Sequence, residues 1–287
     1  MRPGEPTGAA PPFHLKPEQG RLLVPVGARC TMNCTYCYTR FEGFRIHTWS
    51  MDELMAEIHR LLPRHRIRTF QVGYDGDPLA SWDRVLPLLE ALASLGANLN
   101  IQTKSTPTGE QLATLGRLAR RLAEDGRVFS VLTTLTSWDH AEEVEPGAPR
   151  PLDRIESITR LGDLGIPVLV ALRPMIPGVP GEELECILEA AAGAGVRGVV
   201  PGPLYIHGTE SDAGRFIQTS GDDPIWRHLQ TTPVSPPWDP QGNHWLRISS
   251  PRAMRFVKAT ANRLGLPLYW SSAAAMDALE PSHEEGP

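Results

Sequence analysis

Short apolar segments alternate with longer segments of helical periodicity through the first two thirds of the chain, and this alternation constrains the fold most. The apolar segments are β-branched or mixed apolar, as strands buried on both faces tend to be. They predict strands at Arg21–Val26, Thr69–Gly73, Asn98–Thr103, Val128–Thr133, Pro167–Leu172 and Val196–Val200. The patterns between them predict helices at Met51–Leu62, Trp82–Leu95, Gly109–Glu124, Leu152–Leu164 and Glu182–Ala194. Repeated β–α units of about 30 residues imply a parallel sheet with right-handed crossovers.

The number of these units indicates an incomplete barrel. Six are countable, which is two fewer than the eight of a complete TIM barrel. We therefore predict an α/β fold, a partial (β/α)6 TIM-type barrel with a C-terminal extension. Signals at the helix ends agree, because Ser50 and Glu53 have the spacing of a capping box. In addition, Gly126, Gly165 and Gly195 follow predicted helices, where a left-handed C-cap favours glycine.

Beyond the last unit the pattern breaks. Pro201–Trp245 is rich in Pro, Gly, Trp and Asp, and its length and tryptophans favour an ordered, lid-like loop. A last helix at about Pro251–Leu264 and a short strand near Leu266–Trp270 are predicted to follow. The expected divisions are residues 1–20, a flexible N-terminal segment; 21–200, the partial barrel; 201–278, the C-terminal extension; and 279–287, a tail.

The overall charge bears on the partners of the chain. It has 28 basic and 33 acidic residues, a formal net charge of −5. Nucleic-acid-binding proteins usually have a basic excess, because neutralising phosphates supplies most of their affinity, so the charge argues against nucleic acid as the main partner. No run of about 18 apolar residues occurs, and the N-terminal stretch lacks the apolar region of a signal peptide. We expect no membrane association and a cytoplasmic location.

Three of the four cysteines, Cys30, Cys34 and Cys37, lie close together directly after the first predicted strand. Such clustering favours a metal site in a reducing compartment over a disulfide framework. Thiolates at this spacing can bind one iron–sulfur cluster, and with only three of them one iron of a cubane keeps an open position for catalysis. A tetrahedral zinc site with His47 as the fourth ligand is the competing interpretation. The fourth cysteine, Cys186, lies on a predicted outer helix, where a buried structural thiol is expected.

The Cys-x3-Cys-x2-Cys motif, with the aromatic Tyr36 before its last cysteine, resembles that of the radical SAM superfamily. This resemblance implies a [4Fe–4S] cluster on Cys30, Cys34 and Cys37 whose open iron binds S-adenosylmethionine (SAM). It further implies that an electron from the cluster cleaves SAM to methionine and a 5′-deoxyadenosyl radical, which abstracts hydrogen from a substrate. Tyr36 is expected near the adenine of SAM, with plain packing beside the cluster as the alternative.

Later strand ends supply candidate SAM contacts. Members of the superfamily often carry Gly-Gly-Glu after the second strand, but this chain has Gly73-Tyr-Asp-Gly-Asp77 instead. A carboxylate at Asp75 or Asp77 can take the SAM ammonium by a charge-assisted hydrogen bond, whereas Asp77 before Pro78 can also simply form a turn. The remaining expected SAM contacts are Lys104 for the carboxylate, Thr133 and Thr134 for the ribose, and Arg173, which could equally meet an anionic substrate. The alternative for the two threonines and for Arg173 is an ordinary polar group at a strand terminus.

The order of the later motifs resembles the spore photoproduct lyase-like branch of the superfamily over about residues 20–200. These motifs are the "TKS" of Thr103–Ser105, the "TT" at Thr133, the "EPG" of Glu145–Gly147, Arg154, the "LG" and "IPV" near Ile166, and the "IPG" of Ile176–Gly178. A photoproduct lyase returns hydrogen through a cysteine in the middle of its barrel, but no cysteine lies between Cys37 and Cys186. This absence argues against DNA repair, although Tyr74 or Tyr205 could replace the donor. These two tyrosines and His207 are the candidates for catalytic residues.

We therefore predict a radical SAM enzyme acting on a small-molecule or short-peptide substrate, in a rearrangement, epimerisation, dehydrogenation or ring formation. Its enzyme type, lyase, isomerase or oxidoreductase, is left open. The alternatives are a DNA photoproduct lyase-like repair enzyme and a non-catalytic iron–sulfur protein. An electron donor such as flavodoxin or ferredoxin is expected as a partner. His207, which follows the sixth strand, is the first choice for substrate contact; the other loop candidates are Met175, Trp226, His228, His244 and Trp245.

Overall fold

The computed structural model describes residues 15–40, 46, 48–208, 223–235 and 245–280. In these residues seven strands form one sheet in the order β1-β2-β3-β4-β5-β6-β7. β1 pairs antiparallel with β2, and β2 to β7 are all parallel. The strands are β1 (Lys16–Glu18), β2 (Arg21–Val24), β3 (Thr69–Val72), β4 (Asn98–Thr103), β5 (Phe129–Thr134), β6 (Val168–Leu172) and β7 (Val199–Pro201).

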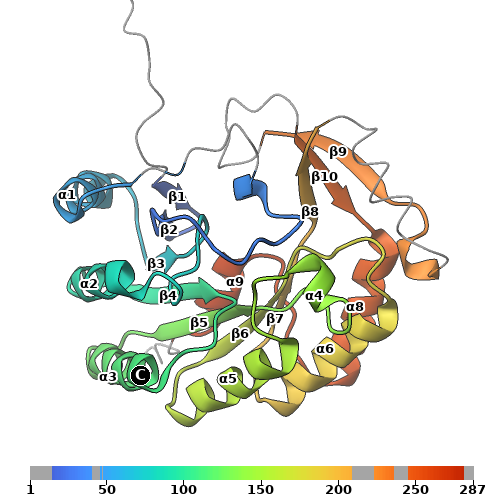
Figure 1. The fold of residues 1–287 in the computed structure, drawn as a ribbon. Helices are drawn as coiled ribbons and strands as arrows, with labels where there is room; N and C mark the ends of the chain where they lie inside the picture. Colours follow the sequence, from blue (N-terminus) through green and yellow to red (C-terminus); the bar gives the residue numbers. More distant parts are fainter. Residues whose placement is uncertain (1–14, 41–45, 47, 209–222, 236–244, 281–287) are drawn as a thin grey trace, which may run out of the picture.

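Helices follow the strands in chain order and lie along the outer face of this curved sheet (Figure 1). They are α1 (Met51–Leu61), α2 (Trp82–Ala93), α3 (Gly109–Glu124), α5 (Pro151–Asp163) and α6 (Gly181–Gly193), with the one-turn α4 (Ala141–Val144) before α5. Apolar residues of these helices and of the strands form the main core. This arrangement confirms the predicted partial (β/α)6 barrel.

The local signals that position these helices are also present. The side chain of Ser50 accepts from the backbone N–H of Glu53, and the Glu53 side chain reaches back, so the capping box at the start of α1 is complete. Gly126, Gly165 and Gly195 all have positive φ (70°, 77° and 74°) and end helices as predicted.

The segment predicted as a lid-like loop instead contributes strands to a second, smaller sheet. Its described parts include β8 (Leu204–His207), the 3-10 turn η3 (Pro224–Trp226) and β9 (Gln230–Val234), and β10 (Trp245–Ser249) completes an antiparallel sheet in the order β8-β10-β9. Leu204, Ile206, Leu246 and Ile248 form a buried cluster that also contacts Tyr36. The loop prediction was wrong here because the prolines and glycines obscure a short alternating pattern, which gains stability only from cross-strand pairing.

The two ends of the barrel also differ from expectation. Residues 16–18, assigned to a flexible lead-in, form β1 because they pair with β2. The last helix is present as α8 (Pro251–Arg263), but the strand expected near Leu266–Trp270 is reduced to one bridge between Leu268 and Val199. An unpredicted helix, α9 (Ser272–Asp277), follows. At the start of the expected tail, Glu280 pairs with Arg68 at 3.7 Å.

Among the described helices, none has the length and apolar character needed to cross a bilayer.

Candidate functional site

The three clustered cysteines line a cavity of about 420 Å³. Its wall includes segments that directly follow β2, β3, β4 and β6, because the carboxyl ends of parallel strands share one edge of the sheet. Of the residues expected from the sequence, those that line it are Cys30, Cys34, Tyr36, Cys37, Tyr74, Asp75, Asp77, Lys104, Thr134, Arg173 and Tyr205. Thr133 and His207 are not among its lining residues.

The turn after β2 directs the chain into the cysteine loop, residues 30–37. Gly27 has φ of 67°, and a Cβ there would lie 2.6 Å from Nε1 of Trp49, so only glycine fits. The carboxylate of Asp75 fixes the same turn by accepting the backbone N–H groups of Val26 (2.6 Å) and Gly27 (3.2 Å).

Burial controls the charge state of the thiols. It raises the pKa of Cys34 to about 11 and also raises the pKa of Cys30, while the positive charge of Lys104 acts in the opposite direction on both. Buried thiolates therefore need additional positive charge, which the irons of a cluster would provide. Three thiols of one loop facing a single cavity fit a cubane, because each thiolate binds a different iron.

No three His, Cys, Asp or Glu side chains of the described residues converge as ligands of one metal ion. His47, the suggested fourth zinc ligand, lies outside the described residues.

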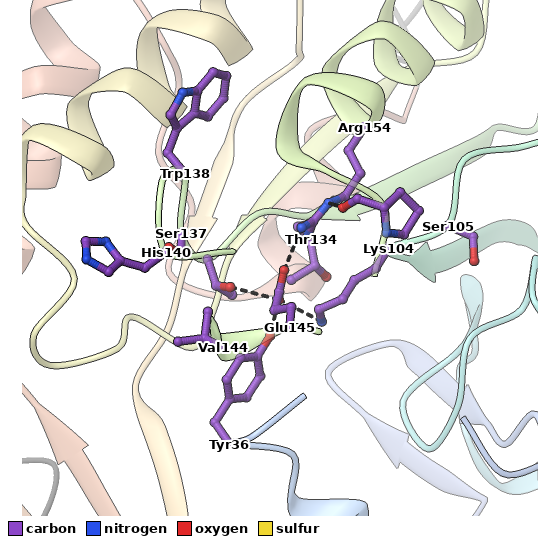
Figure 2. Close-up of polar contacts among 12 residues, drawn as sticks. Tyr36, Lys104, Ser105, Thr134, Ser137, Trp138, His140, Val144, Glu145 and Arg154 are labelled. Carbon is purple, nitrogen blue, oxygen red and sulfur yellow. Dashed lines mark hydrogen bonds and ion pairs between the residues drawn. The ribbon is translucent and has the colours of Figure 1, made fainter. Parts of the chain in front are cut away.

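The buried carboxylate of Glu145 connects the cysteine loop to the rest of the barrel. It accepts hydrogen bonds from the hydroxyls of Tyr36 and Thr136, the latter at 2.8 Å. Its Oε2 lies 2.6 Å from Nη2 of the buried Arg154, and its Oε1 lies 3.8 Å from Nζ of Lys104 (Figure 2). Burial alone would raise the pKa of Glu145, but the charges of Lys104 and Arg154 and the hydroxyl donors outweigh it and hold that pKa below its usual value.

The segment around Glu145 also touches the cysteine loop through backbone atoms. The N–H of Gly147 donates to the carbonyl of Met32 at 2.9 Å, and the N–H of Thr35 donates to the carbonyl of Val144 at 2.9 Å. A Cβ at Gly147 would lie 2.8 Å from the Met32 backbone. The "EPG" motif is thus a docking site for the cysteine loop, a role that the sequence interpretation missed because the two segments are far apart in the chain.

Lys104, the SAM carboxylate ligand expected from the sequence, lines the cavity beside the cysteine loop. Its ammonium lies 5.7 Å from the centre of the Tyr36 ring as well as near Glu145. These contacts hold a single positive charge beside the cysteine loop.

The two aspartates after β3, Asp75 and Asp77, differ in how many hydrogen bonds their carboxylates already accept. Asp77 accepts the backbone N–H groups of Leu79 and Ala80 at 3.1 Å each. It also accepts from the Thr103 hydroxyl, the Lys104 N–H and both polar groups of Ser105, so its oxygens are saturated. These contacts match the turn-forming alternative for Asp77. Asp75 accepts two interresidue bonds from the residues that the structure describes, and burial raises its pKa to about 6. Its carboxylate therefore keeps room for a ligand ammonium.

Of the remaining residues expected to contact SAM, two line the cavity and one does not. Thr134 lines the cavity, and its carbonyl accepts from Nη1 of Arg154 at 2.8 Å. Thr133 is buried within β5, outside the cavity lining. Arg173 lines the cavity, where its Nη2 donates to Oε1 of Gln102 at 3.0 Å.

Of the candidate catalytic residues, the two possible hydrogen donors, Tyr74 and Tyr205, line the cavity. His207 lies instead on β8, with its ring 5.2 Å from that of Trp245 in an edge-to-face contact. Tyr38, which the sequence interpretation did not select, lines the cavity and donates to the carbonyl of Tyr74. Its position directly after Cys37 was the available signal.

Several of the loop residues expected to contact substrate do not line the cavity. Met175, Trp226 and Trp245 are buried outside the cavity lining, and the indole of Trp226 donates to the carbonyl of Val179 at 2.6 Å. His228 is also outside that lining, and His244 lies outside the described residues. The expectation of a buried Cys186 was wrong, because its side of α6 faces solvent and the thiol is exposed.

Comparison with known proteins places this geometry in context. A family model described as the radical SAM superfamily matches residues 24–191. Uncharacterized protein Rv2578c of Mycobacterium tuberculosis is 27% identical over 224 residues, which cover 71% of this chain and 62% of the relative. A Mycobacterium bovis protein, Mb2609c, matches to the same extent. The chain thus spans less than two thirds of the length of these curated relatives.

Solved structures share the fold at low identity. A spore photoproduct lyase mutant with bound AdoMet and dinucleoside spore photoproduct has a TM-score of 0.59 and 14% identity, over 87% of this chain and 76% of that one. Streptococcus suis SuiB bound to precursor peptide SuiA has a TM-score of 0.50 and 12% identity, over 64% of this chain and 39% of that one.

Proposed function

The chain belongs to the radical SAM superfamily, and we propose that it is an enzyme that reductively cleaves SAM and uses the 5′-deoxyadenosyl radical to take hydrogen from a small-molecule or short-peptide substrate. The observation that carries this proposal is that Cys30, Cys34, Cys37, Lys104 and Asp75 all line one cavity. When bound, a [4Fe–4S] cluster supplies the electron that breaks the C5′–S bond of SAM. A donor such as flavodoxin or ferredoxin is proposed to supply that electron.

The residues of the cavity have separate proposed roles. Cys30, Cys34 and Cys37 hold the cluster. Lys104 pairs with the SAM carboxylate, and Asp75 accepts from its ammonium, since opposite charges at these two positions match the two ends of an amino acid.

Other residues shape the rest of the SAM site. Tyr36 presents an aromatic face to the adenine, and Thr134 offers a hydroxyl to the ribose. Asp77 orients Lys104 by accepting its backbone N–H at 2.7 Å.

Anaerobic reconstitution with iron, sulfide, dithionite and SAM tests this function. We expect the wild-type protein to form 5′-deoxyadenosine, detectable by mass spectrometry, and Cys34→Ser to lose both iron content and product. Cys186→Ser is the matched control, because Cys186 is exposed on α6, outside the cavity lining. A wild-type protein with a verified cubane and no 5′-deoxyadenosine would overturn the enzyme proposal in favour of a non-catalytic iron–sulfur protein.

A further inference from the structure

A second group of cavity residues comes from the sheet itself rather than from the cysteine loop. Arg21 belongs to β2, Gln71 to β3 and Gln102 to β4, and Arg173 directly follows β6. Nη1 of Arg21 donates to Oε1 of Gln71 at 2.7 Å, just as Arg173 donates to Gln102. Two guanidinium groups are therefore each fixed by a neutral amide oxygen inside one cavity.

These contacts leave hydrogen-bond donors without acceptors. Because Oε1 of Gln71 receives the guanidinium, its Nε2 group must point elsewhere. Nε2 of Gln71 and Nε of Arg21 are both buried and have no hydrogen-bond partner among the described residues, and Gln71 is only 2% exposed. Both residues line the cavity. Because buried polar groups are normally paired, these two unpaired donors indicate that an acceptor is missing beside the cavity wall.

The charges of the two arginines also favour a bound anion. Arg21 has Glu18 as a partner at 3.0 Å, but Arg173 forms no ion pair with any described carboxylate. Burial and, to a lesser extent, the nearby positive charge of Arg21 lower the pKa of Arg173 to about 10. A bound anion would relieve both effects.

This group is distinct from the proposed SAM carboxylate ligand. Lys104 is held at the cysteine loop by Glu145 and the Tyr36 ring. Arg173 instead has Tyr38 and Tyr205 beside it and is tied to Gln102. Lys104 and Arg173 thus have different neighbours within the same cavity.

We propose that Arg21, Gln71 and Arg173 bind an oxyanion group of the substrate, a carboxylate or a phosphate ester. This inference rests on the proposed function, because it takes the cavity to be a substrate site. Guanidinium groups suit both oxyanions, since each can accept paired N–H bonds.

Anion binding to the reconstituted protein with SAM present tests the proposal. The probes are inorganic phosphate and propionate, titrated separately by calorimetry. We expect saturable binding of at least one probe, weakened about tenfold or more in Arg173→Gln and in Gln71→Glu, because each change removes a buried donor to a charged group. Gln71→Glu keeps a partner for Arg21 while placing a negative charge in the site, so it decides the question if Arg173→Gln does not fold. Arg247→Gln, an exposed change on β10, is the control.

Binding of phosphate alone, propionate alone or both supports the site and identifies the oxyanion. No saturable binding to the wild-type protein would overturn the proposal, as would equal weakening by Arg247→Gln or unchanged affinity in both site variants. SAM cleavage is measured on the same samples. If 5′-deoxyadenosine forms and neither anion binds, only the oxyanion site is wrong; if no cleavage occurs with an intact cluster, the proposed function itself fails.

Discussion

Among individual residues, Glu145 has the most consequential environment. Its carboxylate is buried between two cations, Lys104 and Arg154, and it also accepts the hydroxyl of Tyr36. In the described part of the chain, Oε2 of Glu145 and Nη2 of Arg154 have no other hydrogen-bond partner, so each depends on the other. Removing one member of such a buried set leaves an uncompensated charge, which is more costly than losing a surface pair.

We therefore expect Glu145→Gln to lower the free energy of unfolding by about 3–5 kcal/mol, measured by chemical denaturation. The folded-state pKa of Glu145 is below the unfolded value of about 4.5, so its contribution is present above that pH and is lost as the pH falls through the folded pKa. The wild-type protein should thus lose stability on acidification to a greater extent than the variant.

The control for this change is Glu57→Gln, which breaks an exposed pair with Arg60 on α1. Its effect should be much smaller because solvent screens that pair. Equal losses from the two substitutions would contradict the role assigned to Glu145.

For secondary-structure elements, the important contact is the docking of the "EPG" segment, residues 145–147, against the cysteine loop. The two segments share backbone hydrogen bonds at Met32 and Thr35, and they approach so closely that only glycine fits at position 147. This contact positions the thiols from outside their own loop.

Gly147→Ala should push these segments apart, because its Cβ would lie 2.8 Å from backbone atoms of Thr31 and Met32 that cannot rotate away. We expect a loss of about 1–3 kcal/mol in stability and lower iron content after reconstitution. Gly162→Ala is the matched control, since nothing lies within 4 Å of its Cβ in α5. That change should raise stability by about 0.5–1 kcal/mol, and iron binding unaffected by Gly147→Ala would refute the docking role.

For the molecule as a whole, net charge and the position of the cysteines separate the proposed enzyme from a DNA repair enzyme. The net charge is −5, and no cysteine other than those of the cluster motif is among the residues lining the described cavity. We expect no measurable binding to an irradiated oligonucleotide by fluorescence anisotropy at about 150 mM salt, because phosphate neutralisation needs a basic surface. A spore photoproduct lyase is the positive control, and preferential binding of irradiated over unirradiated DNA would favour the repair alternative.

The sequence by itself determined the order of the barrel strands β2 to β7 and of the main helices between them, the caps at Ser50 and Gly126, and the placement of Cys30, Cys34 and Cys37 after a strand. These features depend on local periodicity and short spacing, which are visible along the chain. Only the tertiary structure decided features that join distant segments. The β8-β10-β9 sheet, the exposure of Cys186 and the saturation of Asp77 belong to this second class. So does the contact between Tyr36 and Glu145, which are 109 positions apart, because packing rather than local pattern brings such groups together.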